Sequence, residues 1–158
     1  MGRDMTIRDR IADFLAQKRI ALVGVSRDKN AFGHRLFADM RARGYDVVPV
    51  NPKAETIAGI PCASRIGDVS PPVDGVLVLT DREQMEQIAG ECSASGITRV
   101  WLHGNSGPGD VSQRAVSLCE DRGIRVVPGY CLYMFLPDAG FIHRFHGWLL
   151  KLMKRIPA

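Results

Sequence analysis

The segment from Gly24 to Gly33 holds residue types that bind phosphate groups in nucleotide-binding proteins. It overlaps the end of an apolar run, 20–25, and reads Gly-Val-Ser-Arg-Asp-Lys-Asn-Ala-Phe-Gly. Gly24 permits a tight turn, Ser26 offers a hydroxyl and a backbone N–H, and a following helix would present its positive end to an anion. Gly33 removes a side chain where helix and backbone must approach closely. The segment predicts a phosphate-binding turn, with an ordinary strand-to-helix turn as the alternative.

The sequence Val50-Asn51-Pro52-Lys53, at the end of the next apolar run, bears on which nucleotide would bind. A fold that binds NAD commonly carries an acidic residue here, which holds the ribose 2′-hydroxyl, and a second glycine in the preceding turn. This chain has Asn51 and Lys53 where the acidic residue would stand, and Ser26 where the second glycine would stand. The positive charge favours a ribose that carries a phosphate, as in NADP or CoA. A solvated loop lysine is the alternative.

Three further features fall at predicted strand ends. His103 ends the fourth predicted strand, and Cys131 follows the fifth. A histidine there could move protons near neutral pH, and a thiol of lowered pKa could exchange with the CoA thiol; simple packing is the alternative for both. The loop 104–109 resembles the surroundings of a serine-protease nucleophile only superficially, because no His and Asp partners accompany it. We interpret it as a strand-to-helix loop.

The elements that must position these residues follow from hydrophobic spacing and helix-end signals. Runs that are apolar throughout predict five buried strands at residues 20–25, 46–50, 76–79, 99–102 and 124–127. Amphipathic helices alternate with them. Thr6 is predicted to begin the first helix, and Gly44 to end the second. The third helix would begin at Thr80, which has capping-box spacing with Glu83. The fourth would begin at Asp110, paired with Gln113, and would end at Gly123. Residues 51–72 are predicted to be loop, with one short extended piece around 56–60.

Strands that are apolar on both sides, alternating with helices, indicate a parallel sheet covered on both faces. Right-handed crossovers then give an α/β fold, a Rossmann-like doubly wound sandwich with a five-stranded parallel sheet. Amphipathic helices are predicted at both ends of the chain. Residues 1–136 would form one domain, with any ligand beyond the carboxyl ends of the strands.

The segment 137–158 is predicted to form a C-terminal amphipathic helix. Eight large apolar residues alternate there with Arg and Lys. We expect this helix to pack on the domain or on a second copy in a homodimer, with an anionic membrane surface as the alternative. His143 and His146 are spaced i, i+3, but without a third ligand they predict no metal site.

Composition excludes several classes of protein. The 158 residues suit one domain, and 46% hydrophobic with 24% charged residues is typical of a globular protein. A net charge of +4 is too small to indicate nucleic acid as a partner. No apolar run could span a membrane, and the polar start is unlike a signal peptide, so we expect a cytoplasmic protein. The four cysteines match neither a zinc site nor a disulfide framework, and Cys92 and Cys119 are expected to be buried.

The chain from residue 19 to about 135 resembles the CoA-binding domain family. That family includes small stand-alone bacterial proteins and the nucleotide-binding domain of succinyl-CoA synthetase alpha subunits. The resemblance rests on the Gly-x-Ser turn, Gly33, the Val-Asn-Pro-Lys sequence and the Ile-Ala-Gly-Ile-Pro sequence at 57–61. It departs at His103, where glutamine is commoner, and in the loop 104–109.

The resemblance implies which residues bind the cofactor, coenzyme A or an acyl-CoA. The pyrophosphate would meet the turn, the ribose and its 3′-phosphate would lie by the Asn-Pro-Lys sequence, and the adenine would lie along the end of the third strand. The implied cofactor-binding residues are Gly24, Ser26, Arg27, Asn30, Gly33, Asn51, Pro52, Lys53, Leu79 and Thr80.

The predicted function is binding of CoA or an acyl-CoA through its ADP part, without evident catalysis. A small NADP-dependent oxidoreductase and a nucleotide-responsive interaction protein are the alternatives. A nicotinamide enzyme would need a substrate domain or long loops, and only the loop 104–109 and the C-terminal segment are available for that purpose.

Overall fold

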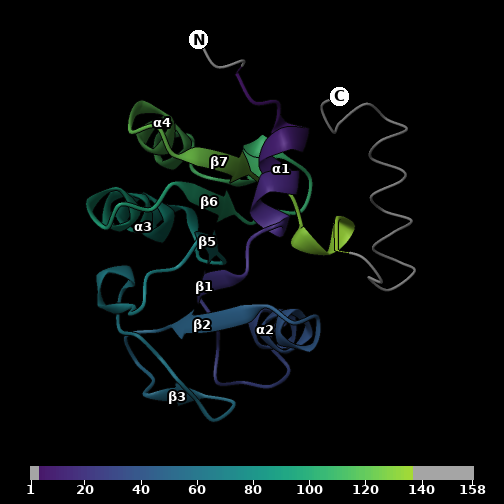
Figure 1. Ribbon diagram of the computed structural model, residues 1–158, viewed down its shortest axis with the longest axis vertical. Coiled ribbons are helices and arrows are strands. Elements are labelled where there is room, and N and C mark those ends of the chain that lie inside the picture. Colours follow the sequence, from purple (N-terminus) through teal and green to yellow (C-terminus); the bar gives the residue numbers. More distant parts are fainter. Residues whose placement is uncertain (1–3, 137–158) are drawn as a thin grey trace.

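A single five-stranded parallel sheet organises the computed structural model, which describes residues 4–136 (Figure 1). Its strands stand in the order β2-β1-β5-β6-β7, and all neighbouring pairs are parallel. The strands are β1 (Arg19–Val23), β2 (Asp46–Val50), β5 (Gly75–Val78), β6 (Arg99–Leu102) and β7 (Arg125–Pro128). A small antiparallel pair, β3 (Thr56–Ile57) and β4 (Ile60–Pro61), lies in the connection after β2. The predicted five-stranded parallel sheet is confirmed.

Within residues 4–136, four α-helices cover the two faces of the sheet. They are α1 (Ile7–Leu15), α2 (Phe32–Ala42), α3 (Arg82–Ala94) and α4 (Gln113–Asp121). Figure 1 shows α1 and α2 on one face and α3 and α4 on the other. Three short 3₁₀ segments complete the connections: η1 (Ile66–Asp68), η2 (Pro108–Asp110) and η3 (Leu132–Met134). The arrangement is a doubly wound Rossmann-like sandwich.

Side chains along each strand alternate between two separate cores, as the two-residue period of a strand requires. In β1, Ile20 and Leu22 enter the core shared with α1 and α2, whereas Ala21 and Val23 enter the core shared with α3 and α4. All four side chains are buried. Apolar residues on both sides of the strands therefore demand helices on both faces.

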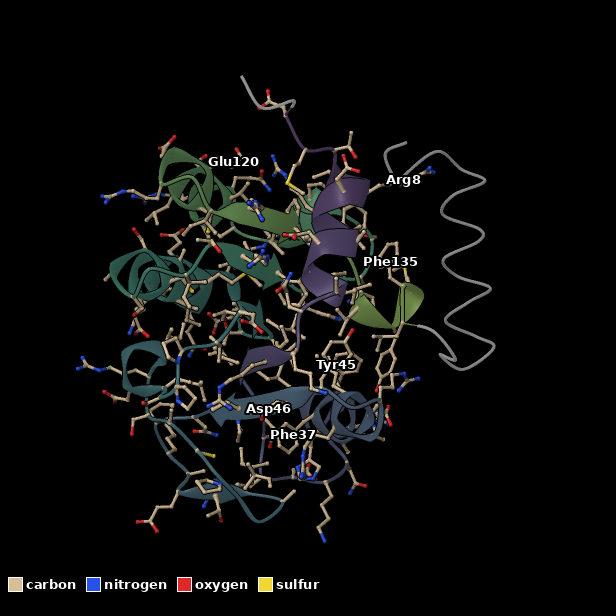
Figure 2. All side chains as sticks on the ribbon, in the orientation of Figure 1. Arg8, Phe37, Tyr45, Asp46, Glu120 and Phe135 are labelled. Carbon is tan, nitrogen blue, oxygen red and sulfur yellow. The ribbon has the colours of Figure 1, made fainter. Side chains whose placement is uncertain are left out.

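The core beneath α1 is built from aromatic rings. Phe14 meets Trp101 edge to face at 5.4 Å between ring centroids, and the Trp101 indole N–H donates to the Tyr130 carbonyl at 2.8 Å. Gly75 in β5 makes room for this cluster, because a Cβ there would lie 2.9 Å from the Phe14 ring. Phe135, which follows η3 and is labelled in Figure 2, completes the cluster, with its ring centroid 5.9 Å from that of Trp101.

Local hydrogen bonds confirm one predicted helix start and correct two. Thr6 caps α1 and forms a capping box with Asp9. For α3 the cap is Asp81, whose carboxylate accepts from the backbone N–H of Gln84, and not Thr80 one residue earlier. For α4 the cap is Ser112, because Asp110 lies in η2 and its carboxylate is bonded to the preceding loop. Both predicted starts, Thr80 and Asp110, were therefore too early.

Cys92 and Cys119 are buried as predicted, and all four cysteines are free thiols. Burial raises the pKa of Cys119 to about 11. No helix among residues 4–136 is both long enough and apolar enough to cross a membrane. The predicted C-terminal helix at 137–158 lies outside the described residues.

Ion pairs at the amino-terminal edge of the sheet tie α1 to β6 and β7. The Asp13 carboxylate accepts from Arg99 Nε at 2.8 Å and from Arg125 Nη1 at 3.0 Å. The hydrogen bond from Arg99 is the main reason why the pKa of Asp13 lies below its ordinary value, against the opposing effect of burial. The hydroxyl of Tyr45, which is labelled in Figure 2 and directly precedes β2, donates to the Leu15 carbonyl of α1 at 2.7 Å.

Replacing Asp13 with Asn should lower the free energy of unfolding by about 1–2 kcal/mol at pH 7, since both arginines lose their charged partner. The folded-state pKa is lowered, so the contribution is present above the unfolded pKa near 3.8 and is lost as pH falls through the folded value. Urea unfolding at pH 7 and at pH 3 measures it. A difference between the proteins that does not shrink in acid would contradict this role of the carboxylate.

Candidate functional site

The carboxyl ends of the strands bring the predicted site residues into one row. Val23 is the register partner of both Val50 and Val78, and Val78 is in turn the partner of Leu102. The residues that follow these strand ends therefore emerge side by side at one edge of the sheet. In sheet order they are Asn51, Gly24, Leu79 and His103.

The chain direction across the sheet reverses at β1, which has β2 on one side and β5 on the other. In open α/β sheets, ligands bind outside the carboxyl ends of the strands at such a switch point. A cavity of about 740 Å³ lies at this place. We call it the β1–β2 cleft, and it is lined by Val23, Gly24, Val25, Ser26, Val50, Asn51, Pro52, Lys53, Ser64, Arg65, Thr80, Gln84, Gln87, Ile88 and Glu91.

The turn between β1 and α2 is held by its own polar groups. Ser26 Oγ accepts from the backbone N–H of Asp28 at 3.0 Å, and Asp28 Oδ1 accepts from that of Asn30 at 2.9 Å. Helix α2 then begins after Ala31, which offers no side chain to cap it. The other three α-helices in residues 4–136 are capped by side chains, those of Thr6, Asp81 and Ser112. Among residues 4–136, no side chain therefore caps the positive end of α2.

Two glycines let the turn, α2 and β5 approach one another closely. Gly24 has φ +98°, and a Cβ there would lie 3.1 Å from the backbone carbonyl of Leu79. A Cβ on Gly33 would lie 3.1 Å from the Gly24 oxygen and from Leu79 Cδ1. This close approach confirms the packing reason predicted for Gly33.

The Asn-Pro-Lys sequence after β2 faces the cleft from the other side. Asn51 Nδ2 donates to the Val25 carbonyl at 3.0 Å, and its Oδ1 accepts from the Lys53 backbone N–H at 2.8 Å. Asn51 thus joins the end of β2 to the turn after β1. The Lys53 side chain is exposed and forms no ion pair with any residue from 4 to 136.

Six of the ten predicted binding residues line the β1–β2 cleft: Gly24, Ser26, Asn51, Pro52, Lys53 and Thr80. The other four lie near it. Arg27 and Asn30 are exposed on the turn, Gly33 is buried beneath it, and Leu79 lines a neighbouring cavity. The structure brings the ten residues to one edge of the sheet.

Several cleft residues were missed by sequence reasoning. Ser64 and Arg65 come from the connection between β4 and η1, which the isolated bridge between Val50 and Ala63 holds against the end of β2. Gln84, Gln87 and Glu91 lie on α3, where Gln87 Nε2 donates to Glu91 Oε1 at 3.2 Å. Two features of the sequence could have indicated them: a basic residue in the loop, and polar residues about one helical turn apart on α3.

A second cavity, of about 590 Å³, adjoins the cleft at Thr80, which lines both. We call it the His103 pocket, and it is lined by Phe32, Leu79, Thr80, Asp81, Arg82, Met85, His103, Gly104, Asn105 and Asp110. The imidazole of His103 lies 5.0 Å from the Phe32 ring between centroids. Burial lowers the pKa of His103 to about 4, with a smaller opposing effect from Asp110. The ring is therefore neutral at pH 7 and unsuited to the neutral-pH titration considered above.

The loop after β6 is held in place by hydrogen bonds to Asp110 and Gly129. The Asp110 carboxylate accepts from the backbone N–H groups of Asn105 and Ser106, both at 2.7 Å, and these bonds lower the pKa of Asp110. The Gly107 N–H donates to the Gly129 carbonyl at 2.9 Å. Cys131 is buried, and burial raises the pKa of its thiol. The exchange hypothesis required a lowered pKa, so burial of the thiol favours the packing role.

Fold and cleft together define a Rossmann-like α/β protein with a cleft at the topological switch point. The model of the family described as CoA binding domain matches residues 18–137, and the chain belongs to this family. The matched residues include every strand of the sheet and both cavities.

The chain is similar to most of one short relative and to a small part of a much longer one. The uncharacterized protein YneT of Bacillus subtilis is 28% identical over 115 residues, which cover 73% of this chain and 82% of YneT. ADP-forming acetate–CoA ligase II of Archaeoglobus fulgidus is 24% identical over 151 residues, covering 90% of this chain but 22% of the ligase. A solved hypothetical protein from Pyrococcus horikoshii superposes with a TM-score of 0.73 at 23% identity, covering 95% of this chain and 98% of its own.

Replacing Gly24 with Ala should destabilise the protein by about 1–2 kcal/mol, because φ +98° is costly for a residue with a Cβ. Gly90 is the matched control. It lies within α3, where an added Cβ would meet nothing within 4 Å, so Ala there should raise stability by up to about 1 kcal/mol. Chemical denaturation measures both variants. Equal effects would show that the Gly24 backbone has no special requirement.

Proposed function

We propose that this protein binds coenzyme A or an acyl-CoA, with the nucleotide part in the β1–β2 cleft. The observation that carries the proposal is the uncapped start of α2 at the switch point, beside a cleft bordered by Lys53 and Arg65. A helix start and two cations suit a ligand with several phosphate groups. Membership of the CoA binding domain family supports the same ligand.

In this proposal the pyrophosphate lies on the turn after β1. Gly24 and Ser26 border the cleft there, and the absence of a Cβ at Gly24 leaves room for the diphosphate. Arg27 and Asn30 stand on the exposed side of the turn, where they would contact phosphate oxygens from outside. Gly33 contributes by letting α2 approach.

The ribose and its 3′-phosphate would lie between the end of β2 and the connection before η1. Asn51 and Pro52 shape this side, and Lys53 and Arg65 supply the charge. Among residues 4–136, Arg65 has only a long ion pair of 3.5 Å with Asp68, at the surface, so a phosphate could replace it at little cost.

The adenine would lie toward β5 and α3. Leu79 and Thr80 would border it where the two cavities meet. Gln87 and Glu91 offer hydrogen-bonding groups from α3, suited to the donors and acceptors of the adenine edge.

Calorimetric titration should show CoA or acetyl-CoA binding at least about tenfold more tightly than NAD, a difference of about 1.4 kcal/mol. The reason is that the end of β2 presents Asn51 and Lys53 and no carboxylate for a ribose diol. NADP is included in the same series. Equal or tighter NAD binding would contradict the proposal, and NADP binding above that of CoA would favour the oxidoreductase alternative.

Replacing Lys53 or Arg65 with Ala should weaken CoA binding by about 1–3 kcal/mol, the range for hydrogen bonds to charged groups. The loss should largely disappear with dephospho-CoA, which lacks the 3′-phosphate. Arg122→Ala is the matched control, since it removes an exposed positive charge outside the cleft. If the loss is the same with both ligands, neither cation recognises the 3′-phosphate.

A further inference from the structure

The His103 pocket meets the β1–β2 cleft at Thr80 and extends from there to the loop after β6, where Gly104, Asn105 and Asp110 line it. We propose that this pocket, which the pantetheine arm of the proposed ligand would enter, selects neutral acyl groups over acyl groups that carry a carboxylate. This inference rests on the proposed function, because it requires the pyrophosphate to lie on the turn after β1.

Continuity of the two cavities gives the arm its path. Thr80 lines both, and the turn after β1 separates them: Gly24 and Ser26 border the cleft, whereas Phe32, at the start of α2, borders the pocket. A ligand held at the turn by its pyrophosphate therefore has one end in each cavity. The nucleoside occupies the larger one, and the arm enters the smaller.

The charges that line the pocket favour a neutral group. Two acidic side chains, Asp81 and Asp110, and one basic side chain, Arg82, line the pocket. All three are already engaged: Asp81 caps α3, Asp110 holds the loop after β6, and Arg82 Nη2 donates to the Gly109 carbonyl at 2.7 Å. Two carboxylates against one guanidinium would repel an acyl group with its own carboxylate.

His103 supplies the unused hydrogen-bonding group. Its Nε2 is buried and has no partner among residues 4–136. An unsatisfied buried nitrogen costs free energy, which a ligand amide or thioester would recover. The lowered pKa keeps the ring neutral, so the ring presents one donor and one acceptor. Because Nε2 is buried, the imidazole must turn for a ligand to reach this nitrogen.

The test compares four ligands on the full chain: adenosine 3′,5′-bisphosphate, CoA, acetyl-CoA and succinyl-CoA. The bisphosphate lacks the arm and reports on the nucleotide site alone. We expect acetyl-CoA to bind about fivefold more tightly than succinyl-CoA. His103→Leu should weaken acetyl-CoA binding about tenfold and leave the bisphosphate unchanged, whereas His103→Gln, which keeps hydrogen-bonding groups, should lose less.

A spectroscopic measurement needs no substitution. The ¹⁵N signals of the His103 ring should shift with acetyl-CoA and stay in place with the bisphosphate. Unchanged signals with both ligands, or equal affinity for the two acyl-CoAs, would overturn the inference while bisphosphate binding still supports the nucleotide site. Failure of every ligand to bind would overturn the proposed function and this inference together.

Discussion

The structure depends on burying a sheet whose strands are apolar on both sides. In β1, β5 and β6 neighbouring side chains enter opposite cores, and the central ones are fully buried. Neither core could be exposed without losing roughly 25 cal/mol per Å² of apolar surface. Helices must therefore lie on both faces, and the connections between parallel strands must cross from edge to edge. Polar side chains near the sheet therefore gather where the strands begin and end.

These two edges serve different purposes. At the amino-terminal edge charges are paired: Asp13 joins Arg99 and Arg125, and the Asp74 carboxylate accepts from the backbone N–H of Arg19 at 2.9 Å. At the carboxyl edge, Lys53 has no such partner among the described residues, and α2 begins without a side-chain cap. One edge holds the helices in place, and the other leaves donors and charges open to a ligand.

Close backbone packing creates the site without exposing the core. Gly24 and Gly33 bring the turn and α2 against Leu79, and the same contact separates the β1–β2 cleft from the His103 pocket. A similar approach of Gly107 to Gly129 fixes the loop that borders the pocket. Glycine is required at these places because backbone meets backbone, which leaves no volume for a Cβ. The glycines of the proposed phosphate-binding turn are thus also required by packing.

The sequence by itself determined the sheet, the helices and the row of strand ends, because the hydrophobic period depends only on which side of each element is buried. It located the turn at Gly24 and the Asn-Pro-Lys sequence at Asn51, since both directly follow apolar strands. Only the tertiary structure decided which distant polar residues face them: Arg65 from a loop, Gln87 from the exposed side of α3. It also decided that the Cys131 thiol and His103 Nε2 are buried. Burial and the meeting of separate elements arise from packing, which the spacing of residues along one element does not encode.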